Sequence, residues 1–503
     1  MTGSPPRAPR RQAALLALVL IGGGLLMLPR LGAQSLWVDE GLTVIAVSGA
    51  QSVPDLVDRV RTLDTQPPAS HLVLYALRGL VPRDEFGWRL SSFLLCEAAI
   101  VLLWLAATRL FGPTVAILAA VAAQFSPFLA FYAMEARGYA LWLMACCGAL
   151  YAMQRWLEAP AGFGWAVVWG LANALGLWTH PFHLFAMVMQ MVVALTAILK
   201  GSVPAGVARR AFGTSLAAQA LAVLLFLPCL FAILSRDPIG RGVGWTRNPT
   251  GVSVLYYPFA LVFGFSFGPS LGELHTDPLR LLLGKHLLAS LAAAAAFVVL
   301  VLAAALLARQ AWDDPRRRAL LTGTALALSA GLAGPAIYVV LRSFPLLPRH
   351  LIYVWPAVPL LEALALVRLP RLRPALLAVL ALQGLALLNL LYNPAYAKDD
   401  ERGAVRFALA RSGERPVVLG DVAPIYAPAG RGLLRNRTDP GEASPFADAT
   451  DVWLADSRAW EDPEGRYRAR LQRTLGGLGL VDAGEDASFR GVVLRHWRRG
   501  PSS

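Results

Sequence analysis

The sequence has few charged residues and few cysteines. Asp, Glu, Lys and Arg make up 16% of its 503 residues, while 56% are hydrophobic; soluble domains carry about 25% charged residues. This composition excludes an ordinary soluble protein and predicts that most of the chain lies in lipid. The cysteines all fall within apolar runs, which argues against a disulfide framework and against a zinc site. They are Cys96, Cys146, Cys147 and Cys229.

Several common motifs are also missing. There is no P-loop, no Gly-x-Gly-x-x-Gly, no Ser-His-Asp signature and no evident internal repeat. The net charge of +14 does not indicate a nucleic-acid partner, because residues 395–503 carry 17 Lys and Arg against 16 Asp and Glu, a difference of only +1. The remaining +13 lies mostly in the N-terminus and in short loops between apolar segments, as expected for charges that set membrane topology.

Eleven apolar segments are long enough to span a membrane. They lie at residues 13–30, 88–108, 112–132, 139–157, 164–180, 182–199, 212–234, 287–308, 319–341, 350–367 and 374–392. The segments at 182–199 and 252–268 are open to reassignment. With the N-terminus in the cytoplasm, alternating loops collect Arg and Lys on the cytoplasmic side, which is the positive-inside pattern. A cleaved signal peptide at residues 1–33 is the competing interpretation.

This topology predicts a multi-pass protein of the bacterial inner membrane with dense polar segments on the outer face. They are the loops 31–87 and 235–286, the turn 133–138 and the tail after residue 393. His71–Val81 is too short to span and is expected to form an interfacial helix. The aromatic run 252–268, interrupted by Pro258, is expected to lie flat at the interface or to re-enter the membrane.

The tail changes character at Asn393-Pro394. Helix-period and strand-period segments alternate there, which predicts a small extracytoplasmic α/β domain at 394–503 after a membrane domain at 1–393. A flexible loop is expected at Ala427–Ser444. The predicted helices are Arg402–Arg411 and Glu461–Leu475, and the predicted strands are Pro416–Gly420, Asp451–Ala455 and Arg490–Arg495.

Asp39 and Glu40 follow the first apolar segment and are the leading candidates for chemistry. Carboxylates beside a membrane span are costly unless they have a function. They are expected either to cap a helix running Gly41–Ala50, to act as a general base toward a hydroxyl, or to bind a divalent cation. The sequence leaves metal binding open.

Further polar residues lie at the outer ends of predicted spans. Arg137 and Arg349 are candidates for holding a phosphate, because guanidinium matches phosphate oxygens in a bidentate way; the alternative is that they reach toward lipid headgroups. The other candidates for substrate binding are Asp64, His71, Glu135, Tyr139, His180 and Tyr353. Simpler interpretations exist for these residues. The segment 64–68 is then a turn stiffened by prolines, and the residues at the ends of spans anchor the helices at the membrane interface.

In order and spacing, these residues resemble those of the polytopic GT-C glycosyltransferases that use polyprenyl-phosphate sugars. The similar families are the protein O-mannosyltransferase-like and the aminoarabinose lipid A transferase-like families. The resemblance covers roughly residues 13–360. It rests on Trp37-Val38-Asp39-Glu40-Gly41, Asp64-x-x-Pro67-Pro68, Arg89-Leu90-Ser91-Ser92, Glu135-Ala136-Arg137-Gly138-Tyr139 and Pro348-Arg349-His350-Leu351-Ile352-Tyr353.

The resemblance implies a polyprenyl-phosphate sugar donor, an outer-face active site and an inverting single displacement. Asp39, or otherwise Glu40, is then expected to deprotonate an acceptor hydroxyl of a glycan, lipid or protein, while Arg137 and Arg349 stabilise the leaving phosphate. One departure from some lipid A transferases is Gln66, where they have Lys before the prolines. A transporter or lipid flippase is the alternative, although such proteins tend to have repeats and midplane charges; a non-catalytic membrane scaffold is the third possibility.

Overall fold

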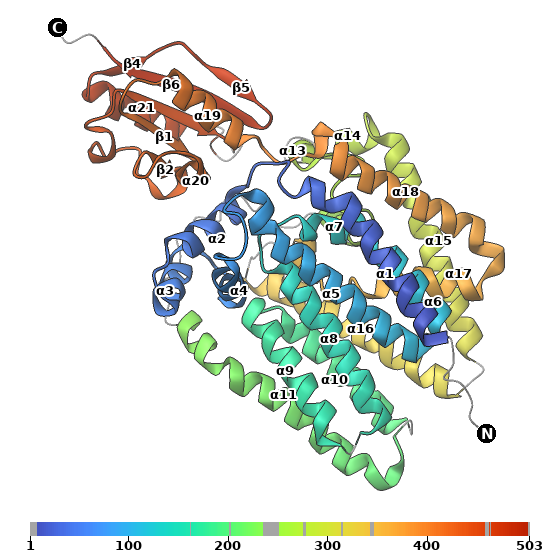
Figure 1. Ribbon diagram of the computed structural model, residues 1–503. Coiled ribbons are helices and arrows are strands. Elements are labelled where there is room, and N and C mark those ends of the chain that lie inside the picture. Colours follow the sequence, from blue (N-terminus) through green and yellow to red (C-terminus); the bar gives the residue numbers. More distant parts are fainter. Residues whose placement is uncertain are drawn as a thin grey trace.

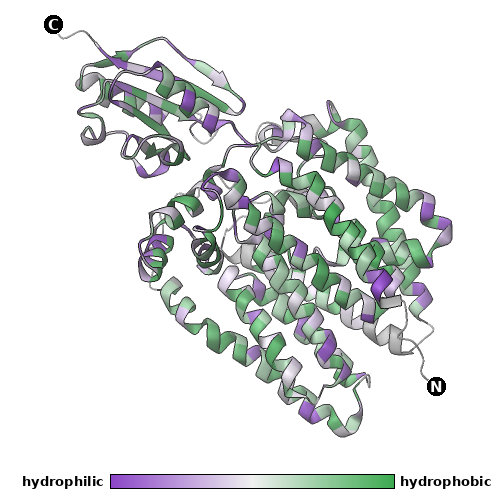
Figure 2. Ribbon diagram, viewed as in Figure 1, coloured by the Kyte–Doolittle hydropathy of each residue, from purple (hydrophilic) through white to green (hydrophobic). Residues whose placement is uncertain are grey.

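The computed structural model describes residues 8–160, 162–200, 203–234, 251–274, 278–312, 315–342, 347–457, 462 and 464–500. Figure 1 shows a bundle of long helices with a small sheet-containing unit at the end far from the N-terminus. The bundle is largely apolar along its helices, whereas the unit at the C-terminus mixes polar and apolar residues (Figure 2). The prediction of a mostly helical membrane protein with a small C-terminal α/β unit is confirmed.

Each predicted span coincides with helical structure. The helices of the bundle are α1 (Ala8–Met27), α5 (Glu85–Phe111), α6 (Pro113–Gln124), α7 (Pro127–Ala133), α8 (Tyr139–Glu158), α9 (Phe163–Thr179), α10 (His183–Leu199), α11 (Ala205–Leu234), α15 (Leu287–Trp312), α16 (Pro315–Arg342), α17 (Ala357–Arg368) and α18 (Arg373–Tyr392). Short 3-10 turns lie at η1 (Leu28–Arg30), η2 (Pro348–Leu351), η3 (Pro370–Leu372) and η4 (Pro394–Tyr396).

Among the described residues, five helices are long and apolar enough to cross a membrane, or six if a bent pair counts as one span. The total of eleven spans therefore stays a prediction. The segment 112–132 is not one continuous helix: α6 and α7 are bent by 59° at a break. The bend follows from Ser126-Pro127, where the Ser126 hydroxyl caps α7 and the proline lacks the amide that would continue α6.

The segment 350–367 also differs from a simple span. It begins with η2 and turns, and α17 has only 12 residues. Turns at residues 352–356 connect η2 to α17. The segment predicted to be re-entrant or interfacial contains α12 (Gly251–Phe263), which packs on α7, η2 and α18. Its position relative to the membrane stays a prediction. The rest of the predicted loop 235–286 holds α13 (Leu271–Leu274) and α14 (Pro278–Leu283), while 235–250 and 275–277 lie outside the described residues.

The first loop, predicted to lie on the outer face, is helical. It contains α2 (Val38–Gly49), α3 (Val53–Leu63) and α4 (Ala69–Leu77). A helix is thus present at α4, and its interfacial position stays a prediction. The helix expected at Gly41–Ala50 begins three residues earlier, which places both acidic residues inside its first turn. These three helices lie at the left of the bundle, below the C-terminal unit, in Figure 1.

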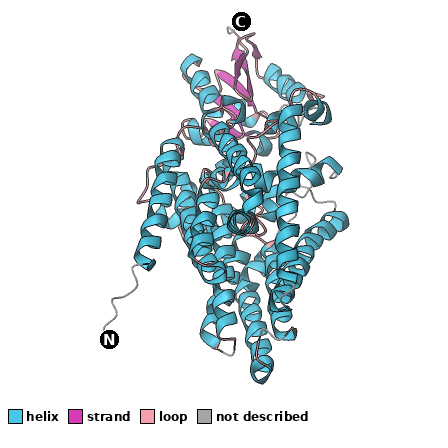
Figure 3. Cartoon of the chain, turned by 90° about the vertical axis from the view of Figure 1, so that its right-hand side faces the viewer, coloured by secondary structure: helices cyan, strands magenta, loops and turns pink. Residues whose placement is uncertain are grey.

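The C-terminal unit is a mixed sheet of order β2-β1-β3-β6-β4, with β5 paired to β6. β1 runs parallel to β2 and β3, and β6 runs antiparallel to β3, β4 and β5. The strands are β1 (Pro416–Gly420), β2 (Gly432–Leu434), β3 (Asp451–Asp456), β4 (Leu480–Asp482), β5 (Ala487–Phe489) and β6 (Val492–Arg499). In Figure 3 they gather at one end of an otherwise helical molecule.

Alternation along β1 explains the two layers of helices on this sheet. Val417 and Leu419 face one core with α21 (Arg466–Gly477), while Val418 faces another with α19 (Glu401–Arg411). The prediction of a loop at 427–444 is wrong at β2, which is a strand. The unit also contains the helix α20 (Ala423–Tyr426) and the turns η5 (Arg435–Arg437) and η6 (Ser444–Phe446). The predicted helix at 461–475 begins at Arg466. The boundary between the two domains at residue 393 stays a prediction.

Candidate active site

Asp39 and Glu40 occupy adjacent positions in the first turn of α2. Successive residues of an α-helix are about 100° apart around its axis, so the two side chains must point in different directions. Glu40 is fully buried, whereas the Asp39 side chain is 24% exposed. The two carboxylates thus have separate surroundings and do not form one paired acidic site.

Glu40 is the centre of a buried ion-pair network. Arg89 of α5 donates from Nε to Glu40 Oε1 and from Nη2 to Oε2, both at 2.8 Å. The Ala136 amide donates to Oε1 at 2.9 Å, and the Lys398 ammonium to Oε2 at 2.9 Å. Oε2 also accepts the Trp37 amide at 3.4 Å, which is the helix-capping role considered from the sequence.

These contacts fix the ionisation of Glu40. Burial alone raises the pKa of its carboxyl, but the Arg89 guanidinium and the Lys398 ammonium outweigh burial and lower the pKa to about 2. A carboxylate with so low a pKa and both oxygens occupied is a poor proton acceptor. Glu40 therefore suits a structural role.

Asp39 of α2 pairs with Arg349 of η2. Arg349 Nη1 lies 3.1 Å from Asp39 Oδ2, and the two side chains are 19% and 24% exposed. The guanidinium also lies 6.0 Å from the Trp37 ring and 5.8 Å from the Tyr139 ring. The structure thus places an accessible carboxylate and an accessible guanidinium, 310 residues apart in sequence, side by side.

Arg137 is held by a different carboxylate. Its guanidinium forms a buried, two-pronged ion pair with Asp64, and Nη1 also donates to Thr43 Oγ1 at 2.9 Å and to the Asp39 carbonyl at 3.1 Å. His71 Nε2 lies 3.2 Å from Asp64 Oδ2. Burial raises the pKa of the Asp64 carboxyl, but Arg137 and His71 outweigh it and hold that pKa well below its usual range. Arg137 thus links two segments of the first loop, α2 and the C-cap of α3, to the 133–138 turn.

Glu135 has no hydrogen-bond partner on either carboxylate oxygen and is 1% exposed. The nearest cation is the Lys398 ammonium, 3.8 Å from Oε1. Burial raises the pKa of Glu135 to about 7, with Lys398 opposing the rise and Glu40 adding to it. Lys398 therefore lies between two carboxyl groups: the pKa of Glu40 is lowered and the pKa of Glu135 is raised.

The remaining predicted residues are aromatic or imidazole groups beside this cluster. The Tyr139 hydroxyl accepts from Gln66 Nε2 at 2.9 Å, and its ring lies 6.4 Å from that of His180. His180 stacks on Trp142 at 4.2 Å. Tyr353 is a core residue whose hydroxyl donates to the Gly331 carbonyl at 2.7 Å. Of these residues, Tyr139 lies against the Arg349 guanidinium, whereas His180 and Tyr353 pack on Trp142.

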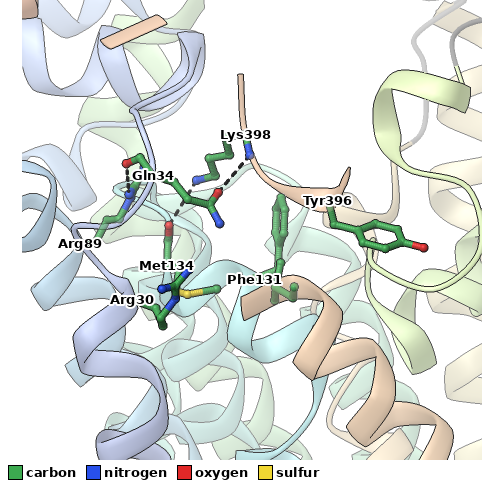
Figure 4. Close-up of a pocket in the computed structure, with 8 residues that line it drawn as sticks. Arg30, Gln34, Arg89, Phe131, Met134, Tyr396 and Lys398 are labelled. Atoms are coloured by element: carbon green, nitrogen blue, oxygen red, sulfur yellow. Dashed lines mark hydrogen bonds between the residues drawn. The ribbon is translucent and has the colours of Figure 1, made fainter. Parts of the chain in front are cut away.

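Sequence reasoning did not single out Lys398 as a site residue. It lies in the polar stretch after α18, and nothing local distinguishes it. Its ammonium reaches into the bundle beside Gln34 and Met134 (Figure 4). For Arg89 the signal in the sequence is its position at the start of the predicted span 88–108, where the positive-inside pattern disfavours a cation that has no anionic partner.

No group of three or more His, Cys, Asp or Glu side chains suited to a metal ion occurs in the described part of the chain. Asp39 pairs with the Arg349 side chain, whereas Glu40 pairs with the side chains of Arg89 and Lys398. The arrangement of this acidic pair therefore gives no support to the divalent-cation hypothesis.

The helical bundle with its loops and C-terminal α/β unit has the GT-C fold of membrane glycosyltransferases. ArnT from Cupriavidus metallidurans, in the apo state and bound to undecaprenyl phosphate, has this fold with a TM-score of 0.58 at 16% identity, over 96% of this chain and 98% of ArnT. The archaeal oligosaccharyltransferase AglB from Archaeoglobus fulgidus, in complex with an inhibitory peptide and a dolichol-phosphate, gives 0.52 at 11% identity, over 91% and 72%. No protein-family model and no curated protein matches the sequence. The predicted GT-C-like fold is confirmed.

Proposed function

We propose that this protein is an integral-membrane glycosyltransferase that moves a hexosyl or pentosyl group from a polyprenyl-phosphate donor to an extracytoplasmic hydroxyl. The observation that carries the proposal is the 3.1 Å pairing of Asp39 with Arg349, both accessible, at the outer end of the bundle. Two proteins of the same fold have been solved with a polyprenyl phosphate bound, which supports the donor class.

Asp39 is the proposed general base. As the acceptor oxygen attacks the anomeric carbon, its proton passes to the Asp39 carboxylate, and the bond from that carbon to the phosphate oxygen breaks with its electron pair going to phosphate. A base must lie within hydrogen-bond reach of the proton it removes, and Asp39 has one oxygen away from Arg349 for this contact. The single displacement inverts the anomeric carbon.

Arg349 is the proposed stabiliser of the leaving phosphate. Charge grows on the phosphate oxygens as the bond breaks, and a preorganised guanidinium lowers the energy of that state. In the structure the guanidinium pairs with Asp39. Donor binding would draw it toward the phosphate and leave Asp39 free to accept a proton.

The other charged candidates are assigned supporting roles. Arg137 fixes Asp64, Thr43 and the Asp39 backbone, and is therefore a positioning residue. Glu40 and Arg89 hold the loop that carries Asp39. Tyr139 and His180 form the wall of the site. The acceptor, whether glycan, lipid or protein, enters from the outer face of a bacterial inner membrane in this proposal, with the N-terminus in the cytoplasm.

Purified protein incubated with a panel of polyprenyl-phosphate sugars tests this function. We expect acceptor-dependent release of polyprenyl phosphate from one donor. Asp39→Asn should lower the rate at least about 100-fold, the scale of general-base catalysis, without weakening donor binding. Asp58→Asn, which removes an exposed carboxylate of the same loop, is the matched control and should retain the rate.

Arg349→Met separates the two proposed roles. It should weaken donor binding and turnover together, because it removes the phosphate partner. Full turnover by Asp39→Asn would refute the assignment of the base, and no turnover by the wild type with any donor in the panel would refute the donor class.

A further inference from the structure

Two glutamates lie deep in the helical bundle, outside the proposed site. Glu97 is near the middle of the 27-residue helix α5, about 18 Å along the axis from Glu85. Glu362 belongs to α17 and is 3% exposed. An ionised carboxyl at such a depth in a membrane is costly unless a cation balances it. Among the described residues, the only side chain that interacts with either carboxyl is a glutamine.

Each glutamine belongs to a neighbouring helix. Gln124, at the end of α6, donates from Nε2 to Glu97 Oε1 at 2.8 Å. Gln383 of α18 donates from Nε2 to Glu362 Oε1 at 2.6 Å. The two short helices, α6 and α17, have 12 residues each and pack on each other. Each pair therefore joins a short helix, which cannot span a membrane alone, to a long neighbour.

The pair of Glu97 and Gln124 contains two buried oxygens without a partner. They are Glu97 Oε2 and Gln124 Oε1. Both atoms are acceptors while the carboxyl is ionised, so neither can satisfy the other. A proton on Oε2 turns the carboxyl into a donor, which can return a hydrogen bond to the Gln124 oxygen. One proton would thereby remove a buried charge and satisfy both oxygens.

Gln124 is also held by α1. The amide lies directly on the backbone at Gly23, where an added Cβ would overlap Gln124 Nε2. The Gln124 side chain is completely buried. This packing leaves the amide little room to turn away from Glu97, and it makes the pair a meeting point of α1, α5 and α6.

The short helices lead directly to the segments of the proposed site. At the bend after α6, the Ser126 hydroxyl accepts a hydrogen bond from Trp355 Nε1 at 3.3 Å, which connects this bend to the turn before α17. Beyond the bend, α7 leads into the 133–138 turn that carries Arg137, and η2 ahead of α17 carries Arg349. A shift of either short helix would therefore move one of these arginines.

We propose that Glu97 and Glu362 are positioning residues, each a protonated carboxylic acid that joins a short helix to a long one through its glutamine. Together the two acid–amide pairs hold α6 and α17, and through them the segments that carry Arg137 and Arg349. Neither glutamate touches a substrate. The positioning role rests on the proposed function, whereas the protonated state of the two carboxyls does not.

Infrared spectroscopy of the full-length protein, in a detergent without carbonyl groups, tests the protonated state. The C=O stretching band of a carboxylic acid is separate from the bands of a carboxylate, and exposed carboxyls are ionised at mildly alkaline pH. We expect the acid band in the wild type, and Glu97→Gln and Glu362→Gln should each remove part of it. Asp58→Asn, at an exposed position, is the control and should leave the band unchanged. An acid band that a Gln substitution does not reduce would overturn the proposal for that glutamate.

Substitution by leucine tests what the pairs hold. Glu97→Leu and Glu362→Leu leave a buried amide without its partner, so each should lower the thermal unfolding midpoint. The Gln variants can still exchange hydrogen bonds with the partner amide and should keep the wild-type midpoint. With an active donor, the Leu variants should lower kcat by up to about 100-fold, because small misplacements of a site reduce turnover strongly. The Gln variants should retain kcat.

Leu94→Ala in α5 and Leu385→Ala in α18 are the matched controls, because both leucines are exposed on the same helices. They should keep the midpoint and kcat. A wild-type midpoint in the Leu variants would overturn the holding role of the pairs, and an unchanged kcat in destabilised Leu variants would overturn the positioning role. A wild type that transfers no sugar would refute the proposed function and with it the positioning role, while the infrared and unfolding results would still decide whether the acid–amide pairs exist.

Discussion

At the scale of single residues, Asp39 and Glu40 are neighbours in sequence with different chemical environments. Glu40 is completely buried among Arg89, Lys398 and two backbone amides, and Asp39 faces an accessible guanidinium. The sequence alone left either residue as the base. The 100° rotation between adjacent helical positions, once α2 is known to start at Val38, explains why only one of them faces Arg349.

The Glu40–Arg89 pair leads to a prediction about stability. Removing one partner of a buried ion pair leaves the other charge uncompensated, at a cost of about 3–5 kcal/mol. Glu40→Gln should therefore lower the free energy of unfolding by that amount, measured in detergent micelles by chemical or thermal unfolding. Glu158→Gln breaks the Arg109 pair, whose side chains are both 40% exposed, and should cost no more than about 1 kcal/mol. Equal effects of the two substitutions would contradict the role assigned to Glu40.

Glu135 gives a prediction about pH. Its pKa is about 7 in the folded protein against 4.5 as the ordinary value, so the folded state holds its proton more tightly than the unfolded state does. Its contribution to stability is complete below pH 4.5 and is lost as the pH rises toward 7, a change of about 3 kcal/mol. The unfolding midpoint of the wild type should fall over this range.

Glu135→Gln cannot ionise, so this part of the fall should disappear in the variant. Asp58→Asn, at an exposed position, should keep the wild-type profile. The measurement is a series of thermal unfolding curves at increasing pH. Parallel profiles for the wild type and Glu135→Gln would show that this carboxyl does not titrate there.

At the scale of elements, the C-terminal unit docks directly on the loop that carries Asp39. The Tyr426 hydroxyl accepts the Leu36 amide at 2.9 Å and donates to Glu85 Oε1 at 2.8 Å, and Arg402 pairs with Glu85 at 2.9 Å. Gly41 of α2 faces Val422 so closely that a Cβ would lie 2.2 Å from Val422 Cγ1. The absence of a side chain at Gly41 is thus a condition for this contact.

Gly41→Ala should therefore separate the two elements and reduce both the unfolding midpoint and any transfer activity. Shortening the opposing side chain should relieve the clash, so the double variant Gly41→Ala with Val422→Ala should recover part of the loss. Gly384→Ala in α18, where a Cβ meets nothing within 4 Å, serves as the helical control and should be neutral. An undisturbed Gly41→Ala protein would contradict the tight contact.

The elements also show what sequence patterns can and cannot reveal. Helices were predictable from hydrophobic length, and β1, β3 and β6 from apolar runs. β4 and β5 have three residues each and are partly exposed, so they carry no apolar pattern. The partners of Arg137 and Lys398 could not be predicted, because these contacts join segments 73 to 358 residues apart and depend on how the helices pack.

At the scale of the whole molecule, the predicted orientation can be tested by labelling. All four cysteines are buried, so the wild type should react little with a membrane-impermeant maleimide. Ser488→Cys, exposed on the C-terminal unit, should be labelled in intact cells, while Lys200→Cys, in a predicted cytoplasmic loop, should be labelled only after permeabilisation. The opposite pattern would reverse the assigned topology and move the proposed site to the cytoplasm.

The position of Lys398 has a consequence for the order in which the protein matures during synthesis. Glu40 obtains its second cation from a residue 358 positions later, after the last helix of the bundle. A nascent chain that has not yet released this segment holds Glu40 against Arg89 alone and leaves Glu135 without a cation. The loop carrying Asp39 is therefore among the first parts of the chain to be synthesised, but its ion pairs are complete only after Lys398 has been added. A truncation ahead of residue 398 would therefore yield an inserted bundle with an unfinished first loop.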